Sequence, residues 1–99
     1  MAIAEVSVVP LGTETPSVSQ YVARAVKVLE QEKDMKYELT AMGTIIEGDL
    51  DRILVAVKRM HEGVFGEGVV RVLTTLKIDD RRDKAQTMKA KLDSVKKKL

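Results

Sequence analysis

The sequence predicts an α+β fold with the element order β-α-β-β-α-β, followed by a further helix at the C-terminus. Two observations support this order. Apolar residues alternate with a period of two in four segments, and they recur with helical spacing in the segments between them. A split βαβ pattern of this length is typical of the ferredoxin-like sandwich, in which a four-stranded antiparallel sheet carries two helices on one face. We therefore expect a single domain over residues 1–99.

The first strand and the first helix are separated by a segment rich in turn-forming residues. Residues 3–9 alternate as a half-buried strand, and residues 10–17 contain the Pro, Gly, Thr and Ser of a loop. An apolar stripe then predicts a helix that runs to about Glu32. Its N-terminus has two possible caps, either Thr15 with a proline at the first helical position or Ser17 in a capping box.

A hairpin, a second helix and the last strand follow. Residues 36–47 alternate as two strands, and Gly43 between them is expected to have an unusual φ or to form a bulge. Asp49 is a good N-cap for the second helix. The apolar stripe of this helix consists of Leu50, Ile53, Leu54, Val57 and either Met60 or His61. Residues 69–78 have the strongest strand character in the chain.

The C-terminal segment is predicted to form a basic helix from about Arg81. A narrow apolar seam runs along it, formed by Ala85, Met88, Leu92, Val95 and Leu99. Residues 81–99 contain eight Lys or Arg against two acidic residues, whereas the whole chain has a net charge of +2. Such a tail either contacts phosphates or acidic lipid or is simply a solvated helix face, and the second is the more common case.

The sheet face that the two helices leave uncovered is expected to be of mixed character. Its polar residues are Glu5, Ser7, Glu38, Thr40, Arg71, Thr75 and Lys77, joined by Glu47 if the hairpin keeps its register. Apolar residues such as Ile3 and Leu73 lie among them. Two interpretations remain open, a partly buried interface with charges paired across it and a solvated face with ordinary cross-strand pairs.

Composition excludes several classes of function. The chain has no cysteine, which rules out disulfides, thiolate metal sites and Cys nucleophiles. Its single histidine argues against a His-rich metal site. That residue, His61, is expected to sit at a helix end without a catalytic role. No apolar run is long enough for a membrane span, so we expect a cytoplasmic protein without a membrane partner. No catalytic or metal motif was found, which argues against an enzyme.

Four motifs that span nearly the whole chain carry a resemblance to a known family. They are E-V-S-V-V-P-L-G-T (5–13), P-S-V-S-x-Y-V (16–22), Y-x-L-T-x-M-G-T-I-I-E-G (37–48) and G-x-V-R-V-x-T-x-x-K-I-D-x-R (68–81). Together they resemble the small thiamine-binding protein family, related to YkoF. The resemblance implies a ferredoxin-like fold, self-association as a homodimer or homotetramer, and binding of thiamine or its hydroxymethylpyrimidine moiety without a known reaction, metal or cofactor.

The resemblance also implies a set of ligand-binding residues. Carried over by motif, they are Thr13, Ser17, Ser19, Gly43, Thr44 and Glu47. An aminopyrimidine offers ring-nitrogen acceptors and an amino donor, which hydroxyl groups and a carboxyl group can satisfy. Glu47 has a structural alternative, in which it caps the second helix or pairs with Arg71.

Three functional hypotheses follow from the sequence. The first is a non-enzymatic thiamine-binding protein, and the second is a regulatory or assembly module that acts through its oligomer interface. The third is an RNA-binding domain of similar topology. The third is the weakest, because residues 69–78 contain no aromatic residue on which a base would stack.

Overall fold

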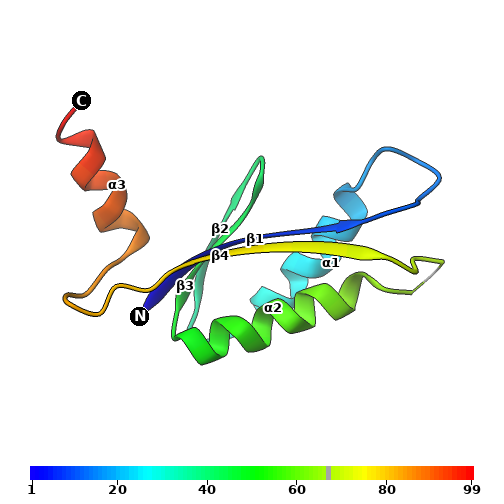
Figure 1. Ribbon diagram of the computed structural model, residues 1–99, viewed down its shortest axis with the longest axis horizontal. Coiled ribbons are helices and arrows are strands. Elements are labelled where there is room, and N and C mark those ends of the chain that lie inside the picture. The colour runs from blue at the N-terminus through cyan, green and yellow to red at the C-terminus, as the bar shows by residue number, and fades with distance from the viewer. Residues whose placement is uncertain (67) are drawn as a thin grey trace.

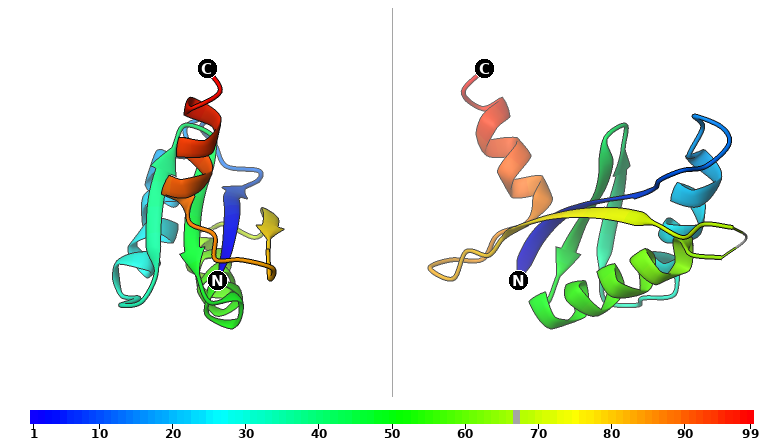
Figure 2. Two further views of the ribbon diagram at one scale, coloured as in Figure 1. Left: turned by 90° about the vertical axis from the view of Figure 1, so that its left-hand side faces the viewer. Right: turned by 45° about the vertical axis from the view of Figure 1, so that its right-hand side comes forward.

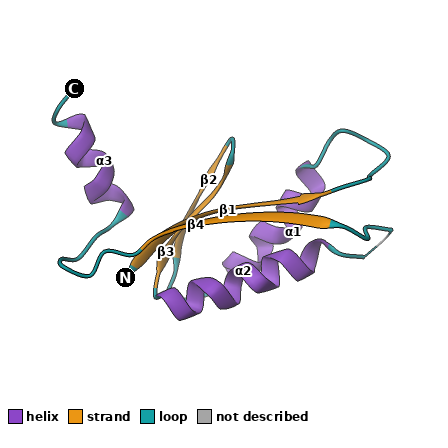
Figure 3. Cartoon of the chain, viewed as in Figure 1, coloured by secondary structure: helices purple, strands orange, loops and turns teal. Residues whose placement is uncertain are grey.

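The computed structural model describes residues 1–66 and 68–99, and its elements follow the order expected from the sequence (Figures 1 and 3). The strands and helices are β1 (Ala2–Pro10), α1 (Ser19–Glu30), β2 (Lys36–Thr40), β3 (Gly43–Gly48), α2 (Leu50–Val64), β4 (Val72–Asp79) and α3 (Met88–Lys96). The strands form one sheet in the order β2-β3-β1-β4. All neighbouring pairs are antiparallel, which confirms the ferredoxin-like arrangement.

The core lies between one face of the sheet and helices α1 and α2. In the central strand β1, the even-numbered residues Ala2 to Val8 are buried, because successive side chains of a strand point to opposite faces. Figure 1 shows both helices on the same side of the sheet. The largest fully buried side chains are Leu29, Ile46, Ile53, Met60, Val6 and Val64.

Helix α1 begins later than the sequence indicated, and neither expected cap forms. Its N-cap is Val18, which has no side chain able to accept a hydrogen bond. The hydroxyl groups upstream are used within the loop, since Thr15 Oγ1 donates to the carbonyl oxygen of Ser17 at 3.3 Å and Ser17 Oγ lies 3.4 Å from Ser19 Oγ. The loop therefore holds the polar groups that were expected to cap the helix.

Gly43 has an ordinary strand conformation, so the expected bulge or unusual φ is wrong. The register of β2 and β3 is continuous through the Thr40–Gly43 pair, and the positive-φ glycines of the described residues are Gly12, Gly66 and Gly68. A Cβ atom at Gly43 would lie 2.9 Å from the carbonyl oxygen of Val6. A glycine is required there by the close approach of β1.

The last two helices also differ in detail from the prediction. In α2, Ala56, Met60 and Val64 are buried, whereas Leu54 of the predicted stripe is 44% exposed. Asp49 is the N-cap residue of α2, as expected, but its side chain makes no capping hydrogen bond. Helix α3 begins at Met88 instead of Arg81. The α3 start follows from its cap, because Thr87 Oγ1 accepts a hydrogen bond from the Ala90 N–H at 3.0 Å.

Helix α3 meets the sheet through its N-terminal part, where the Met88 N–H donates to Glu47, and the rest of the helix projects away from the fold (Figures 1 and 2). None of its residues is buried. The radius of gyration is 14.7 Å, whereas a compact domain of this size has about 13 Å. Within the described part of the chain, no helix has the length and apolarity needed to cross a membrane.

Two glycine substitutions test the packing of β1 against β3. Gly43→Ala is expected to destabilise the protein by about 1–3 kcal/mol, because the new Cβ atom must displace backbone. Gly63→Ala, inside α2, is the matched control, since its Cβ would meet only Val28 Cγ2 at 4.0 Å. That change should stabilise the helix by up to about 1 kcal/mol. Urea unfolding of both variants measures the difference, and equal stability changes would contradict the proposed close contact.

Candidate functional site

The uncovered face of the sheet carries the charged residues expected there. Glu5 lies opposite Lys77 on one side and Ile45 on the other, and Ile45 lies opposite Glu38. Glu47 joins this face, because it pairs in register with Ile3. Lys77 Nζ lies 3.2 Å from Glu5 Oε1, a cross-strand ion pair that both interpretations of this face include.

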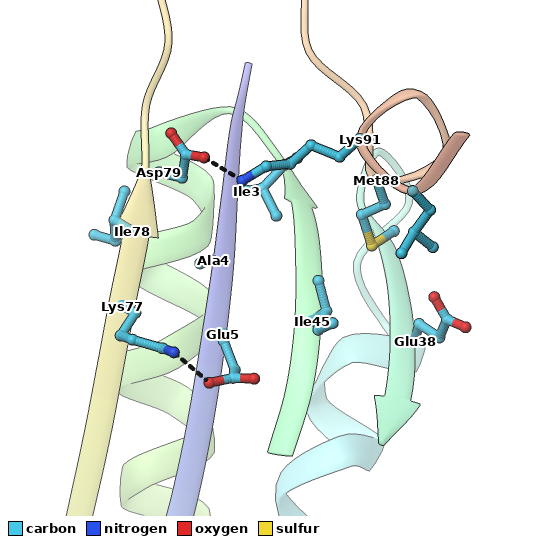
Figure 4. A pocket seen from close by; sticks show the side chains of 11 residues that line it. Ile3, Ala4, Glu5, Glu38, Ile45, Lys77, Ile78, Asp79, Met88 and Lys91 are labelled. Atoms are coloured by element: carbon cyan, nitrogen blue, oxygen red, sulfur yellow. Dashed lines mark hydrogen bonds and ion pairs between the residues drawn. The ribbon is translucent and has the colours of Figure 1, made fainter. Parts of the chain in front are cut away.

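A groove of about 440 Å³ lies between this face and α3 (Figure 4). Ile3 and Ile45 lie on the sheet side of the groove, and Met88 and Leu92 of α3 form the facing wall. The other residues that line it are Ala4, Glu5, Glu38, Lys77, Ile78, Asp79 and Lys91. The volume is within the range of about 300–1,000 Å³ that small-molecule sites occupy. Apolar walls with a few charged groups suit a ring-containing ligand.

The charged groups of the groove differ in whether they already have a partner. Lys77 pairs with Glu5, and Lys91 Nζ donates to Asp79 Oδ2 at 2.5 Å. The hydrogen bond from Lys91 lowers the pKa of the Asp79 carboxyl below its ordinary value. Glu38 has no hydrogen-bond or ion-pair partner among the described residues. The groove therefore holds one uncompensated negative charge.

Glu47 links the sheet to α3. Its side chain is only 3% exposed, and Oε1 accepts a hydrogen bond from the Met88 N–H at 2.7 Å. A carboxylate at a helix N-terminus satisfies a free N–H group and interacts favourably with the helix dipole. Glu47 thus caps α3. The sequence had offered two other structural roles, a cap on the second helix or an ion pair with Arg71. This contact and the Lys91–Asp79 pair hold the wall of the groove in place.

The residues carried over from the family motifs are distributed over three places. Thr13 lines a polar cavity of about 410 Å³ together with Gln20 and Tyr21. Its Oγ1 donates to the carbonyl oxygen of Thr15 at 2.9 Å. Ser17 and Ser19, which lie 3.4 Å apart, belong to the same loop region.

Gly43 and Thr44 line a different hollow, of about 240 Å³, between α1 and the β2–β3 hairpin. Thr44 is buried on the helix side of the sheet. Glu47 lies at the far end, opposite Ile3, whereas Thr13 follows the other end of β1. Seven residues of strand separate these ends, or about 23 Å. Within one subunit, the structure does not bring the six residues together.

The groove residues Ile3, Ile45, Met88 and Leu92 were missing from the predicted site. The sequence placed Ile3 among the residues of the open face and gave α3 an apolar seam that needed a partner. It contained no signal for where α3 lies relative to the sheet. That position depends on the contact between Glu47 and Met88, which are 41 residues apart.

His61 has a structural environment at the end of α2. Its Nδ1 lies 2.6 Å from Thr74 Oγ1, and its ring packs edge-on against Phe65 with the centroids 5.4 Å apart. Among the described residues, no group of three or more His, Cys, Asp or Glu side chains could hold a metal ion. The helix-terminal position expected for His61 is confirmed.

Comparison with known proteins identifies the family. The family model described as thiamine-binding protein matches residues 4–96. The chain belongs to the thiamine-binding protein family. The UPF0045 protein YqgV of Bacillus subtilis is 50% identical over 102 residues, which cover 100% of this chain and 98% of that protein. A UPF0045 protein of Methanothermobacter thermautotrophicus is 49% identical over 100 residues, with both chains fully covered.

Solved structures of similar proteins share the fold. The hypothetical protein MJ1052 from Methanocaldococcus jannaschii is 47% identical and superimposes with a TM-score of 0.87, over 96% of this chain and 95% of that one. A Thermotoga maritima protein proposed to act in thiamine biosynthesis or salvage has a TM-score of 0.77 over 95% and 97% of the two chains. It is 23% identical, so this second likeness concerns the fold alone.

Replacement of Glu47 tests whether it positions α3. Glu47→Ala removes the acceptor for the Met88 N–H, and a lost cap costs a helix about 0.5–2 kcal/mol. The helical population of residues 88–96 should therefore fall, as measured by backbone chemical shifts in NMR spectra. Glu38→Ala is the matched control, since it removes a carboxylate from the same face that has no hydrogen bond or ion pair to α3 among the described residues. Unchanged α3 shifts in Glu47→Ala would show that α3 does not depend on this cap.

Proposed function

We propose that this protein binds thiamine or its hydroxymethylpyrimidine moiety without transforming it, in the groove between the open sheet face and α3. The observation that carries the proposal is the groove itself, about 440 Å³ with apolar walls and an unpaired carboxylate. It belongs to a chain of the thiamine-binding protein family. No catalytic family is indicated, and the proposed activity is binding alone.

The chemistry of the groove fits the two rings of such a ligand. Ile3 and Ile45 offer an apolar surface against which a flat ring packs, and Met88 supplies a polarizable thioether on the facing wall. The carboxylates of Glu5 and Glu38 accept hydrogen bonds from an amino group or balance a positive charge. Each neutral hydrogen bond adds about 0.5–1.5 kcal/mol net, so binding requires several contacts together.

The six motif residues keep a place in the proposal. Glu47 holds the wall of the groove through its bond to Met88, so its contribution to binding is indirect within one subunit. Thr13 lines the competing site, the polar cavity before α1, whereas Ser17 and Ser19 lie beside each other at the start of α1 and do not line it. Gly43 and Thr44 lie at a third hollow, which is largely apolar and therefore less suited to a hydrogen-bonding ligand.

Thermal unfolding in the presence of ligand tests the proposed function. Thiamine at 100 times its dissociation constant should add about 2.7 kcal/mol of stability. For a chain of this size, that raises Tm by roughly 10–20 °C, and by less if a larger oligomer melts as a unit. Thiamine phosphate and hydroxymethylpyrimidine are measured in parallel. If none of the three raises Tm at millimolar concentration, the thiamine hypothesis is wrong.

Two variants assign the ligand to one of the competing cavities. Leu92→Ser weakens the apolar wall of the groove, whereas the double change Thr13→Val and Thr15→Val removes two hydroxyl groups that line the polar cavity before α1. Leu54→Ser, another exposed leucine on a helix, controls for the general effect of the substitution. Loss of the ligand-induced shift in the loop variant alone would move the site away from the groove.

A second candidate function is an assembly module that acts through its oligomer interface, and a specific observation favours it. Several large apolar side chains are exposed on the open face and on α3, with Leu73 at 56%, Leu92 at 52% and Val95 at 59%. A monomer gains nothing from leaving these side chains in water. We propose that the protein forms a homodimer or homotetramer in which this surface is covered.

Analytical ultracentrifugation tests the self-association. At micromolar concentration the protein should sediment as a dimer or tetramer, and Val95→Glu should shift it toward the monomer, because the change places a charge on the exposed seam of α3. Val70→Glu is the control, since Val70 is exposed and lies outside the strands. A monomeric wild-type protein at 100 times that concentration would contradict the assembly hypothesis.

A further inference from the structure

The charges around the groove are unequally available to a ligand. Both lysines that line it, Lys77 and Lys91, are engaged by carboxylates at 3.2 Å and 2.5 Å. Glu38 alone has no partner among the described residues, and Figure 4 shows it on the far side of Ile45 from the Glu5–Lys77 pair. A ligand that enters the groove therefore meets a free negative charge but no free positive charge.

We infer that the groove selects a cationic, unphosphorylated ligand over its phosphate esters, and that Glu38 is the residue that sets this preference. The inference rests on the proposed function and specifies the class of ligand within it. A thiazolium-type cation can pair with Glu38 while every existing ion pair of the groove stays intact. No side chain needs to give up a partner for this ligand to bind.

A phosphate ester meets the opposite situation. Its phosphate carries a charge of about −1.5 to −2 at neutral pH. It would be repelled by Glu38, and each lysine of the groove already has a carboxylate beside it, in the Glu5–Lys77 and Asp79–Lys91 pairs. These carboxylates repel a phosphate that approaches either lysine. The phosphorylated ligand therefore gains less from the groove than the cation does.

Another lysine of the same sheet face, Lys36, lies outside the groove. Lys36 lies two residues before Glu38 on β2, on the same face, and opposite Glu47 in register. It does not line the groove. A phosphate held by Lys36 would extend past the end of the groove, which makes Lys36→Gln the variant that detects such binding.

The Glu5–Lys77 pair provides the reciprocal test. Glu5→Gln removes the partner of Lys77 and leaves a free ammonium group in the groove. If the balance of free charges sets the preference, this change should favour phosphate esters, whereas Glu38→Gln should only weaken the preference for the cation. Both changes are therefore expected to shift selectivity toward the phosphate ester, Glu38→Gln by removing a free negative charge and Glu5→Gln by freeing a positive one.

Isothermal titration calorimetry of the full chain with thiamine, thiamine phosphate and hydroxymethylpyrimidine tests the inference. The wild-type protein should bind thiamine roughly tenfold more tightly than thiamine phosphate, because one ion pair near the protein surface contributes a binding free energy of about this size. Glu38→Gln should remove most of that ratio and weaken thiamine more than the neutral pyrimidine. Glu5→Gln should raise the relative affinity for the phosphate. Glu62→Gln, an exposed carboxylate on α2, controls for net charge.

The outcomes separate the inference from the function on which it rests. If thiamine phosphate binds as tightly as thiamine, or more tightly, the inference about selectivity is wrong. Binding of thiamine-like ligands would still be supported by that result. An equal loss for thiamine and hydroxymethylpyrimidine in Glu38→Gln would also overturn it, because Glu38 would then contact the pyrimidine. The absence of heat and of any Tm shift with all three ligands would remove the proposed function itself.

Discussion

Two helices can cover only one face of a four-stranded sheet, and the alternation of β1 decides which residues remain on the other. Ala4, Val6 and Val8 turn toward α1 and α2, where small side chains allow close packing. Ile3 and Glu5 consequently lie on the open face, beside their register partners on β3 and β4. A register shift of one residue would exchange the two faces completely. The apolar groove and its charges thus follow from the same pattern that builds the core.

The groove exists only while α3 stays beside the sheet, and few interactions hold it there. Glu47 caps its first turn, Lys91 pairs with Asp79, and Met88 and Leu92 face the sheet across the groove. An exposed ion pair contributes little to stability. A helix of nine residues is also marginal by itself in water. The wall of the groove is therefore the part of the fold that a ligand or a second subunit would stabilise most.

The fold was predictable because its determinants are local and periodic. The alternation over residues 3–9 and 36–47 sufficed for three strands, and the helical stripes gave two helices with the correct buried side. The errors arose where a tertiary contact or a side-chain bond decided the outcome. Gly43 is required by the carbonyl oxygen of Val6 from a neighbouring strand, and α3 begins where Thr87 supplies a cap.

The candidate site was less predictable, because its parts come from segments whose spatial relation the sequence does not encode locally. Motif resemblance selected Glu47 for its chemistry, as a carboxylate able to meet an aminopyrimidine, and the same carboxylate turns out to be buried against the α3 backbone. One of its oxygens, Oε1, already accepts the bond from the helix N–H, and only 3% of the residue is exposed, so little of Glu47 is available to a ligand in this chain. Glu38, which the family motifs did not select, has no hydrogen-bond or ion-pair partner among the described residues. For ligand recognition, the availability of a charge matters as much as its chemical type.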